Sequence, residues 1–330
     1  MNYEELIDDH FSGVISVRRD GEVVFQKAYG YADLPNQVMN QIDTKFATAS
    51  AGKAFVAVAI LQLIDEGKLR FEDRLGDVLR MDLNLLNRGI TIEQLLDHTS
   101  GIPDYFDESV MDNYDELWQD YPNYKIRSSA DLLPLFINKP MMYPPGERFQ
   151  YNNSGYVMLG LVIEEKTGMR FDEYLQKVVF NPCGMTDTGY YELDRLPARC
   201  ANAYIYDSER QQFYTNIYSV DAKGTGAGGA FTTVMDIHKF WDGLLGGKLI
   251  SSEMVSNMLN LHSSDGSARY GYGMWLIEAG DHFIPFFQGC DPGVSFVSTY
   301  SLKQKLNITI ASNFGSDVWD INEKILKQYK

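Results

Sequence analysis

The sequence predicts an α+β fold in which an antiparallel sheet is flanked by helices and split by a largely helical inserted domain. Segments with strand periodicity occur at both ends of the 330-residue chain, within residues 12–29 and 270–312. Short turns join consecutive strands, which requires antiparallel pairing. The intervening residues carry mainly helical patterns. We expect a sheet domain from residues 1–75 and 266–330 and an inserted domain from residues 76–265.

Turn and cap residues mark the expected elements in order. Asp20-Gly21 is typical of a hairpin turn between the first two strands. Thr91 and Thr233 are each expected to cap the start of a helix, a further helix is expected from Val157 to Lys166, and Ser316 is expected to cap the last one. The later strands are expected at residues 272–277, 282–287, 294–300 and 305–312.

The net charge excludes several classes of partner. The chain has 29 Lys and Arg against 45 Asp and Glu, a formal net charge of −16, which repels nucleic acid and anionic membrane surfaces. No apolar run reaches the ~18 residues that a membrane helix needs, and the first residues lack the basic and apolar regions of a signal peptide. We expect no nucleic-acid partner, no membrane span and a cytoplasmic location, and leave the oligomeric state open.

Cysteine and histidine usage argues against a disulfide framework and a metal site. Cys183, Cys200 and Cys290 cannot all pair, and none lies in a Cys-x-x-Cys spacing. The five histidines form no His-x-x-x-His or His-x-His pattern. We therefore expect reduced thiols, no metal and no organic cofactor.

The strongest chemical signal precedes a buried helix. From Ala54 to Ile64 every residue but Gln62 is apolar, which predicts a helix buried on nearly all sides. Thr48 or Ser50 is expected to cap its start. Lys53 follows Ser50 by three residues, about 300° around and about 4.5 Å along a helix, so the two side chains can touch. Burial lowers the pKa of a lysine, and a neutral lysine can take a proton from a serine hydroxyl.

Other motifs give weaker signals. A phosphate-binding loop around the Gly-Lys pair would need glycine at Ala47 and serine or threonine at Ala54. The glycine-rich segment 224–229 favours a flexible loop, with lining of a catalytic cleft as an alternative. His98 and Ser100 suggest a base and a nucleophile, but they lie at a Gly-Pro turn without a carboxylate partner, which favours a structural loop.

Five motifs, in order along the chain, resemble the serine β-lactamase and penicillin-binding-protein superfamily, in particular the branch of class C β-lactamases, D-Ala-D-Ala carboxypeptidases, D-aminopeptidases and related esterases. They are Ser50-Ala51-Gly52-Lys53, Leu95 to Pro103, Pro144 to Tyr156, Gly228-Gly229-Ala230 and Tyr270-Gly271-Tyr272-Gly273. The likeness runs from about residue 12 to residue 315. It implies an active site between the two predicted domains.

The resemblance also implies roles for individual residues. Ser50 would be the acylated nucleophile, and Lys53 its proton acceptor or a charge that tunes the acceptor. Tyr151 and Asn153 match the Tyr-x-Asn motif, in which the tyrosine passes a proton between Ser50 and the leaving group and the asparagine holds Lys53 and the substrate amide. The backbone N–H groups of Ser50 and Cys290 would bind the oxyanion.

The third family motif departs from its usual form. Phe287-Gln288-Gly289 aligns where the family usually has Lys or His, a small residue and Gly. The family's cation helps to hold a substrate carboxylate. We still expect Phe287, Gln288 and Gly289 to bind substrate, but we expect weak recognition of β-lactam and terminal D-Ala carboxylates.

These observations predict a serine hydrolase, a β-lactamase-related peptidase or esterase that acts through an acyl-enzyme on a small amide or ester. One alternative is a catalytically impaired, penicillin-binding-like protein that serves as a ligand-binding or sensing module, which the altered third motif supports. The clustering of Ser50, Lys53, Tyr151 and Asn153 argues against it, because such a polar group has little structural use. A third alternative is a thiol-dependent hydrolase at Cys290, although no histidine occupies a recognisable partner position.

Overall fold

The main sheet of the protein is antiparallel and joins the two ends of the chain. The computed structural model describes residues 3–111 and 114–329. Within these residues the main sheet has eight strands in the order β2-β1-β14-β13-β12-β11-β10-β9. The first long strand pairs with the last, so that Gly13 lies opposite Ser312. The predicted fold class is therefore confirmed.

Five strands of the main sheet have at least seven residues each, and three are shorter. They are β1 (Gly13–Arg19), β2 (Glu22–Tyr29), β9 (Ser263–Ser264), β10 (Arg269–Tyr270), β11 (Trp275–Ala279), β12 (His282–Asp291), β13 (Val294–Ser301) and β14 (Leu306–Ser312). Smaller sheets pair β3 (Tyr31–Asp33) with β4 (Val38–Met39), β5 (Phe46–Ala47) with β8 (Phe231–Thr232), and β6 (Tyr204–Asp207) with β7 (Gln212–Thr215).

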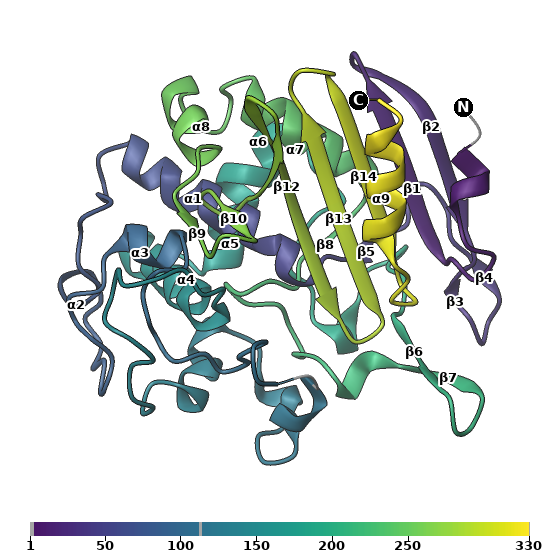
Figure 1. Ribbon diagram of the computed structural model, residues 1–330. Coiled ribbons are helices and arrows are strands. Elements are labelled where there is room, and N and C mark those ends of the chain that lie inside the picture. Colours follow the sequence, from purple (N-terminus) through teal and green to yellow (C-terminus); the bar gives the residue numbers. More distant parts are fainter. Residues whose placement is uncertain (1–2, 112–113, 330) are drawn as a thin grey trace.

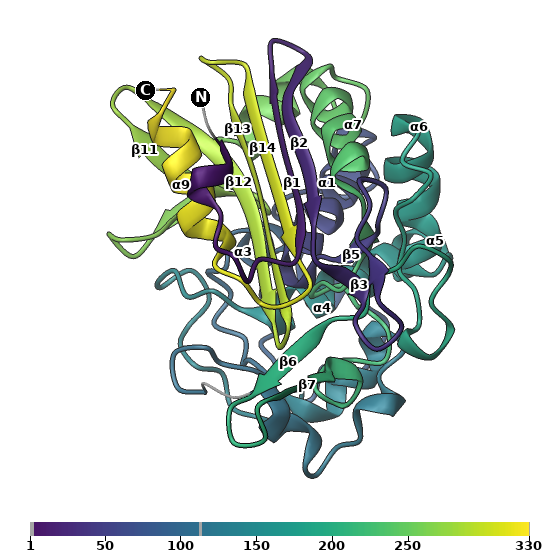
Figure 2. The ribbon, with the colours of Figure 1, turned by 90° about the vertical axis from the view of Figure 1, so that its right-hand side faces the viewer.

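Helices cover both faces of the main sheet. The α-helices of the described residues are α1 (Lys53–Asp65), α2 (Leu75–Val78), α3 (Ile92–Leu96), α4 (Asn153–Thr167), α5 (Phe171–Leu175), α6 (Asn181–Cys183), α7 (Val234–Leu245), α8 (Ser252–Met258) and α9 (Val318–Lys327). Figures 1 and 2 show α9 on one face of the sheet and α1 and α7 on the other. None of the described helices combines the length and apolarity needed to cross a bilayer.

Two hydrophobic clusters hold these layers together. The larger contains α1 and α4 and reaches the sheet through Phe287 and Phe296. The smaller joins α9 to the opposite face of the sheet through residues such as Ile310 and Ile325. Helices α2, α3 and α4 lie to one side of the sheet in Figure 1. The boundaries of the two predicted domains stay a prediction.

Helix starts agree only in part with the expected caps. Thr91 and Thr233 each accept a backbone hydrogen bond at a helix start, as predicted. The predicted Ser316 cap is wrong, because α9 begins at Val318 and Asp317 accepts the bond from Asp320 N at 3.0 Å. The buried α1 also has no side-chain cap.

The hydroxyl groups of Thr48 and Ser50, just before α1, do not cap the helix as predicted. Ser50 lies in a short 3-10 helix, η2 (Ala49–Gly52), which has no side-chain cap either. The Thr48 hydroxyl instead donates to the carbonyl of Ala230 at 2.9 Å. The predicted cap at Thr48 or Ser50 is therefore wrong, and the Ser50 hydroxyl is left for contacts at the start of α1.

Candidate active site

Lys53 lies at the centre of a polar cluster at the start of α1. Its side chain is buried, with 1% exposure. The ammonium donates to Ser50 Oγ at 2.9 Å, to Asn153 Oδ1 at 2.8 Å and to the carbonyl oxygen of Ala227 at 2.6 Å. Three acceptors from three segments therefore fix the amine next to the predicted nucleophile.

The surroundings of Lys53 favour its neutral form. Burial lowers its pKa to about 8, although the negative charges of Glu108, Asp104 and Asp291 act in the opposite direction. Desolvation opposes the charged form of an amine, whereas nearby carboxylates support it. A substantial fraction of Lys53 is therefore deprotonated just above neutral pH, as a general base requires.

Tyr151 completes the contact with the nucleophile. Its hydroxyl is hydrogen-bonded to Ser50, and Lys53 Nζ lies 5.0 Å from the centroid of its ring. Burial, with the charge of Glu108, raises the pKa of Tyr151 well above its usual value. The phenol is thus neutral in the resting site, which favours Lys53 as the proton acceptor and Tyr151 as a relay.

Asp104 holds Asn153 in place and was not identified from the sequence. Its carboxylate accepts from the backbone N–H groups of Asn153 at 2.8 Å and Ser154 at 3.0 Å, and from Asn153 Nδ2 at 3.3 Å. These bonds leave Asn153 Oδ1 to face Lys53. Burial raises the pKa of Asp104 to about 6. The two residues lie 49 positions apart, a separation that no local motif reveals.

His98 holds the segment that contains Tyr151 in place through hydrogen bonds. Its carbonyl accepts from Gln150 N at 3.0 Å, and its Nδ1 accepts from Asn152 N at 3.1 Å. The imidazole ring lies 4.5 Å from the Tyr151 ring between centroids. Burial lowers the pKa of His98 well below its usual value, so the ring is neutral. His98 is therefore a positioning residue for Tyr151.

The end of β12 packs directly on η2. A Cβ atom at Gly289 would lie 2.1 Å from the carbonyl oxygen of Thr48 and 2.6 Å from Ser50 N. Only glycine allows this approach. Cys290 follows it and faces the same cavity as Ser50. The pairing of their N–H groups as an oxyanion hole stays a prediction.

Phe287 is placed differently from the other predicted site residues. It is 2% exposed, and its ring lies 5.5 Å from that of Trp241 and 5.7 Å from that of Phe240. Phe287 is not among the residues lining the cavity, whereas Gln288 and Gly289 are. The aromatic ring is held in the hydrophobic core, so the expected contact of Phe287 with substrate does not agree with its position.

A cavity of ≈ 670 Å³ opens onto these residues. It is lined by Ser50, Tyr151, Asn153, Gln288, Gly289 and Cys290 of the predicted set. The glycine-rich loop contributes Gly224 and residues 227–229, in agreement with the alternative that this loop lines a cleft. The volume is in the range usual for small-molecule sites.

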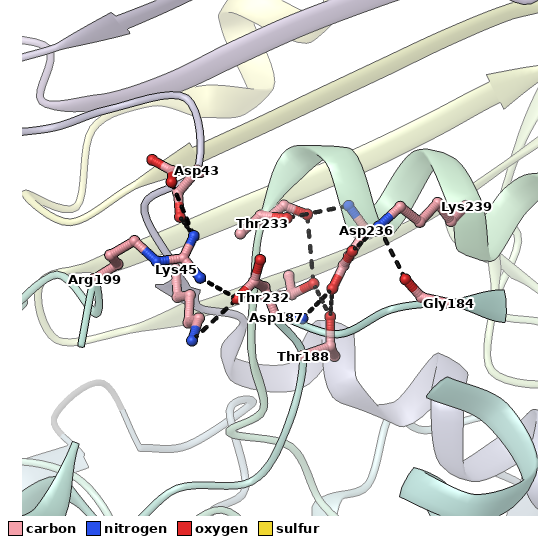
Figure 3. Close-up of polar contacts among 10 residues, drawn as sticks. All are labelled: Asp43, Lys45, Gly184, Asp187, Thr188, Arg199, Thr232, Thr233, Asp236 and Lys239. Atoms are coloured by element: carbon pink, nitrogen blue, oxygen red, sulfur yellow. Dashed lines mark hydrogen bonds and ion pairs between the residues drawn. The ribbon is translucent and has the colours of Figure 1, made fainter. Parts of the chain in front are cut away.

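A polar network anchors the segment that leads to Ser50. Asp187 pairs with Lys45 at 3.2 Å and with Arg199, and its backbone N–H donates to Asp236 Oδ2 at 2.8 Å (Figure 3). Lys239 also pairs with Asp236, at 2.7 Å. These contacts connect the chain before β5 to the start of α7, and β5 immediately precedes the nucleophile.

The thiol of Cys290 is poorly suited to nucleophilic attack. It is a free cysteine, and burial raises its pKa to about 11, with Asp291 and Glu108 acting in the same direction. A reactive cysteine needs a lowered pKa, because the thiolate is the nucleophile. The environment of Cys290 therefore argues against the thiol-dependent alternative.

The fold and the Ser-Lys-Tyr cluster define a protein of the β-lactamase and penicillin-binding-protein class. The family model described as Beta-lactamase matches residues 3–317, and the chain belongs to this family.

Individual relatives agree with this assignment. A penicillin-binding protein of Bacillus subtilis (strain 168) is 26% identical over 345 residues, covering 98% of this chain and 73% of the relative. The crystal structure of a penicillin binding protein from Bacillus halodurans has a TM-score of 0.94 at 36% identity, covering 99% of this chain and 100% of that one. D-amino acid amidase from Ochrobactrum anthropi SV3, complexed with D-phenylalanine, shares the fold with a TM-score of 0.79 at 22% identity. The match covers 98% of this chain and 95% of that chain.

Proposed function

We propose that the protein is a serine hydrolase that cleaves a small amide or ester through an acyl-enzyme on Ser50, as a peptidase or esterase. The observation that carries the proposal is the 2.9 Å contact between Ser50 Oγ and the buried amine of Lys53. The resemblance to penicillin-binding proteins and to a D-amino acid amidase supports amide or ester chemistry.

In the acylation step, Ser50 Oγ adds to the substrate carbonyl carbon while neutral Lys53 takes the hydroxyl proton, directly or through Tyr151. The carbonyl π electrons move onto oxygen, and backbone N–H groups of Ser50 and Cys290 stabilise that oxyanion. When the tetrahedral intermediate collapses, the C–N or C–O bond breaks and the leaving group receives the proton through Tyr151. Acyl-Ser50 remains.

Deacylation repeats these steps with water as the nucleophile. Water gives a proton to the Lys53 and Tyr151 pair, its oxygen adds to the acyl carbon, and the ester bond to Ser50 breaks. Ser50 Oγ recovers the proton, and the acid product leaves. No metal or organic cofactor takes part in this scheme.

The test is turnover of p-nitrophenyl esters combined with intact-mass analysis of the protein after rapid acid quench. We expect hydrolysis and a mass increase equal to the acyl group on Ser50, both lost in Ser50→Ala. Cys290→Ser should retain both. If Cys290→Ser abolishes turnover while Ser50→Ala does not, the thiol-dependent alternative is correct.

The binding-module alternative makes a different prediction for the same experiment. It is favoured by the phenylalanine at position 287, where the family usually has a cation, and by the absence of Lys, Arg and His among the described residues that line the cavity. It predicts that ligands bind, as measured by calorimetry, without any covalent adduct on Ser50 and without turnover of esters or amides.

A further inference from the structure

We propose that the cavity beside Ser50 selects acyl donors that carry a positively charged ammonium group, which Asp221 and Asp291 bind. This inference names the substrate class for the proposed hydrolase and rests on that proposed function for the chemistry. The binding step itself depends only on the charges of the cavity.

The charged residues that line the cavity are all acidic. They are Glu108, Asp221 and Asp291. Of the residues that the structure describes, no lysine, arginine or histidine lines this cavity. Lys53 lies behind Ser50, where its amine is already bound by three protein acceptors. An ammonium group in the cavity therefore meets carboxyl groups that it can ionise and pair with, and no mobile positive side chain competes for them.

Asp291 is the acid whose carboxylate is free to bind a ligand. It is the last residue of β12 and directly follows Cys290, the predicted oxyanion donor. Among the described residues, none donates a hydrogen bond to its carboxylate, whereas the buried Asp104 accepts four. Asp291 is partly buried, its burial disfavours the charged carboxylate, and a bound cation would offset that cost.

Asp221 lies close enough to Asp291 for its charge to act on the Asp291 carboxylate. Its described partner is the Tyr114 hydroxyl, which donates at 3.2 Å. Burial raises the pKa of Asp291 to about 8, and the charge of Asp221 acts in the same direction. Burial also raises the pKa of Asp221 to about 7. Two carboxylates that repel each other in this way are both stabilised by one ammonium placed between them.

Aromatic side chains complete a surface suited to a cation. Tyr105, Tyr114, Tyr191 and Trp275 line the same cavity, and aromatic faces attract ammonium groups. A substrate carboxylate, in contrast, would make ionisation of Asp291 and Asp221 still less favourable. The cavity therefore favours a cation over an anion.

The experiment compares p-nitroanilides of three acyl groups that differ in charge: alanyl (D and L), isobutyryl, in which a methyl replaces the ammonium, and succinyl, which carries a carboxylate. We expect kcat/KM for one alanine enantiomer to exceed that for the isobutyryl compound by on the order of tenfold or more, with the succinyl compound slowest. Asp291→Asn and Asp221→Asn should each reduce the alanine-to-isobutyryl ratio towards one.

The matched control is Glu253→Gln, which removes an exposed acid on α8 outside the cavity and should keep the wild-type ratio. Circular dichroism and thermal melting establish that each variant folds. Equal rates for all three compounds, a preference for the succinyl compound, or an unchanged ratio in both aspartate variants would overturn the proposal.

Calorimetry separates this inference from the proposed hydrolase function. We expect alaninamide to bind the wild-type protein and isobutyramide to bind at least about tenfold more weakly. That result without turnover would contradict the hydrolase function alone. Ester turnover at Ser50 with equal binding of both amides would contradict the ammonium preference alone.

Discussion

Lys53 Nζ lies 2.9 Å from Ser50 Oγ, although the lysine side chain is only 1% exposed. The two residues are three positions apart, at the junction of η2 and α1. The burial that makes α1 a core helix also lowers the pKa of Lys53 to about 8. Packing and proposed chemistry thus depend on the same helix.

Removing the hydroxyl of Tyr151 should slow acyl transfer while leaving the fold intact. Tyr151→Phe keeps the ring, which is stacked on Trp275 with 5.2 Å between centroids. Because the relay to the leaving group is lost, we expect kcat/KM on p-nitrophenyl esters to fall by about 10²- to 10⁴-fold. Tyr218→Phe, at a position that is 80% exposed, is the control and should retain full activity. Unchanged kinetics in Tyr151→Phe would exclude the relay.

Removing the carboxylate of Asp104 should reduce both stability and activity. Asp104→Ala leaves the N–H groups of Asn153 and Ser154 without their acceptor. Each unsatisfied buried group costs about 1–3 kcal/mol, so urea denaturation should show a free energy of unfolding lower by at least that amount. Ester hydrolysis should fall as well, because Asn153 no longer holds Lys53.

The control for Asp104 is a helix cap whose side chain does not line the cavity. Asp317→Ala removes the cap of α9, which accepts from Asp320 N, and such caps contribute about 0.5–2 kcal/mol. We expect lower stability with unchanged kcat/KM. If Asp104→Ala likewise changes only stability, Asp104 has no positioning role.

A methyl group at Gly289 should disrupt the contact between β12 and η2. In Gly289→Ala the new Cβ would lie 2.1 Å from the Thr48 carbonyl oxygen, a backbone atom that cannot move aside freely. We expect loss of ester hydrolysis together with a lower melting temperature. Gly89→Ala, where the nearest atom is the Asn87 side chain at 3.1 Å, is the control. Wild-type activity in Gly289→Ala would show that the backbone near Ser50 is not packed as described.

Placing the family's usual cation at position 287 should not create a carboxylate site. In Phe287→Lys the ammonium would enter the core beside Phe240 and Trp241, and burying an unpaired charge is strongly destabilising. We expect a lower melting temperature and no gain in acylation by penicillin G, as measured by intact mass. A stable variant with faster acylation would show that position 287 faces the cavity.

The residues of the proposed Ser50 site could be predicted from the sequence because their signals are local. Ser50 and Lys53 are one helical turn apart, and Tyr151 and Asn153 form a short motif. The sheet was predictable for the same reason, since short turns fix antiparallel pairing between successive strands.

Residues whose roles depend on distant segments could not be found in this way. Asp104 acts on α4 across 49 positions. The alignment placed Phe287 in a substrate-binding motif, but the faces of β12 are decided by packing against the aromatic core, which a linear pattern does not contain. The predicted cap of α1 is wrong because the Thr48 hydroxyl donates to the carbonyl of Ala230 instead.

The most direct test of the central claim is the pH dependence of Ser50 labelling by a fluorophosphonate. Lys53 accepts the proton only when neutral, so the labelling rate should rise about tenfold per pH unit at low pH and level off above a pKa of about 8. Lys53→Met should label slowly at every pH. A rate that stays constant from about pH 6 to about pH 10, or one that Lys53→Met leaves unchanged, would contradict activation of Ser50 by Lys53.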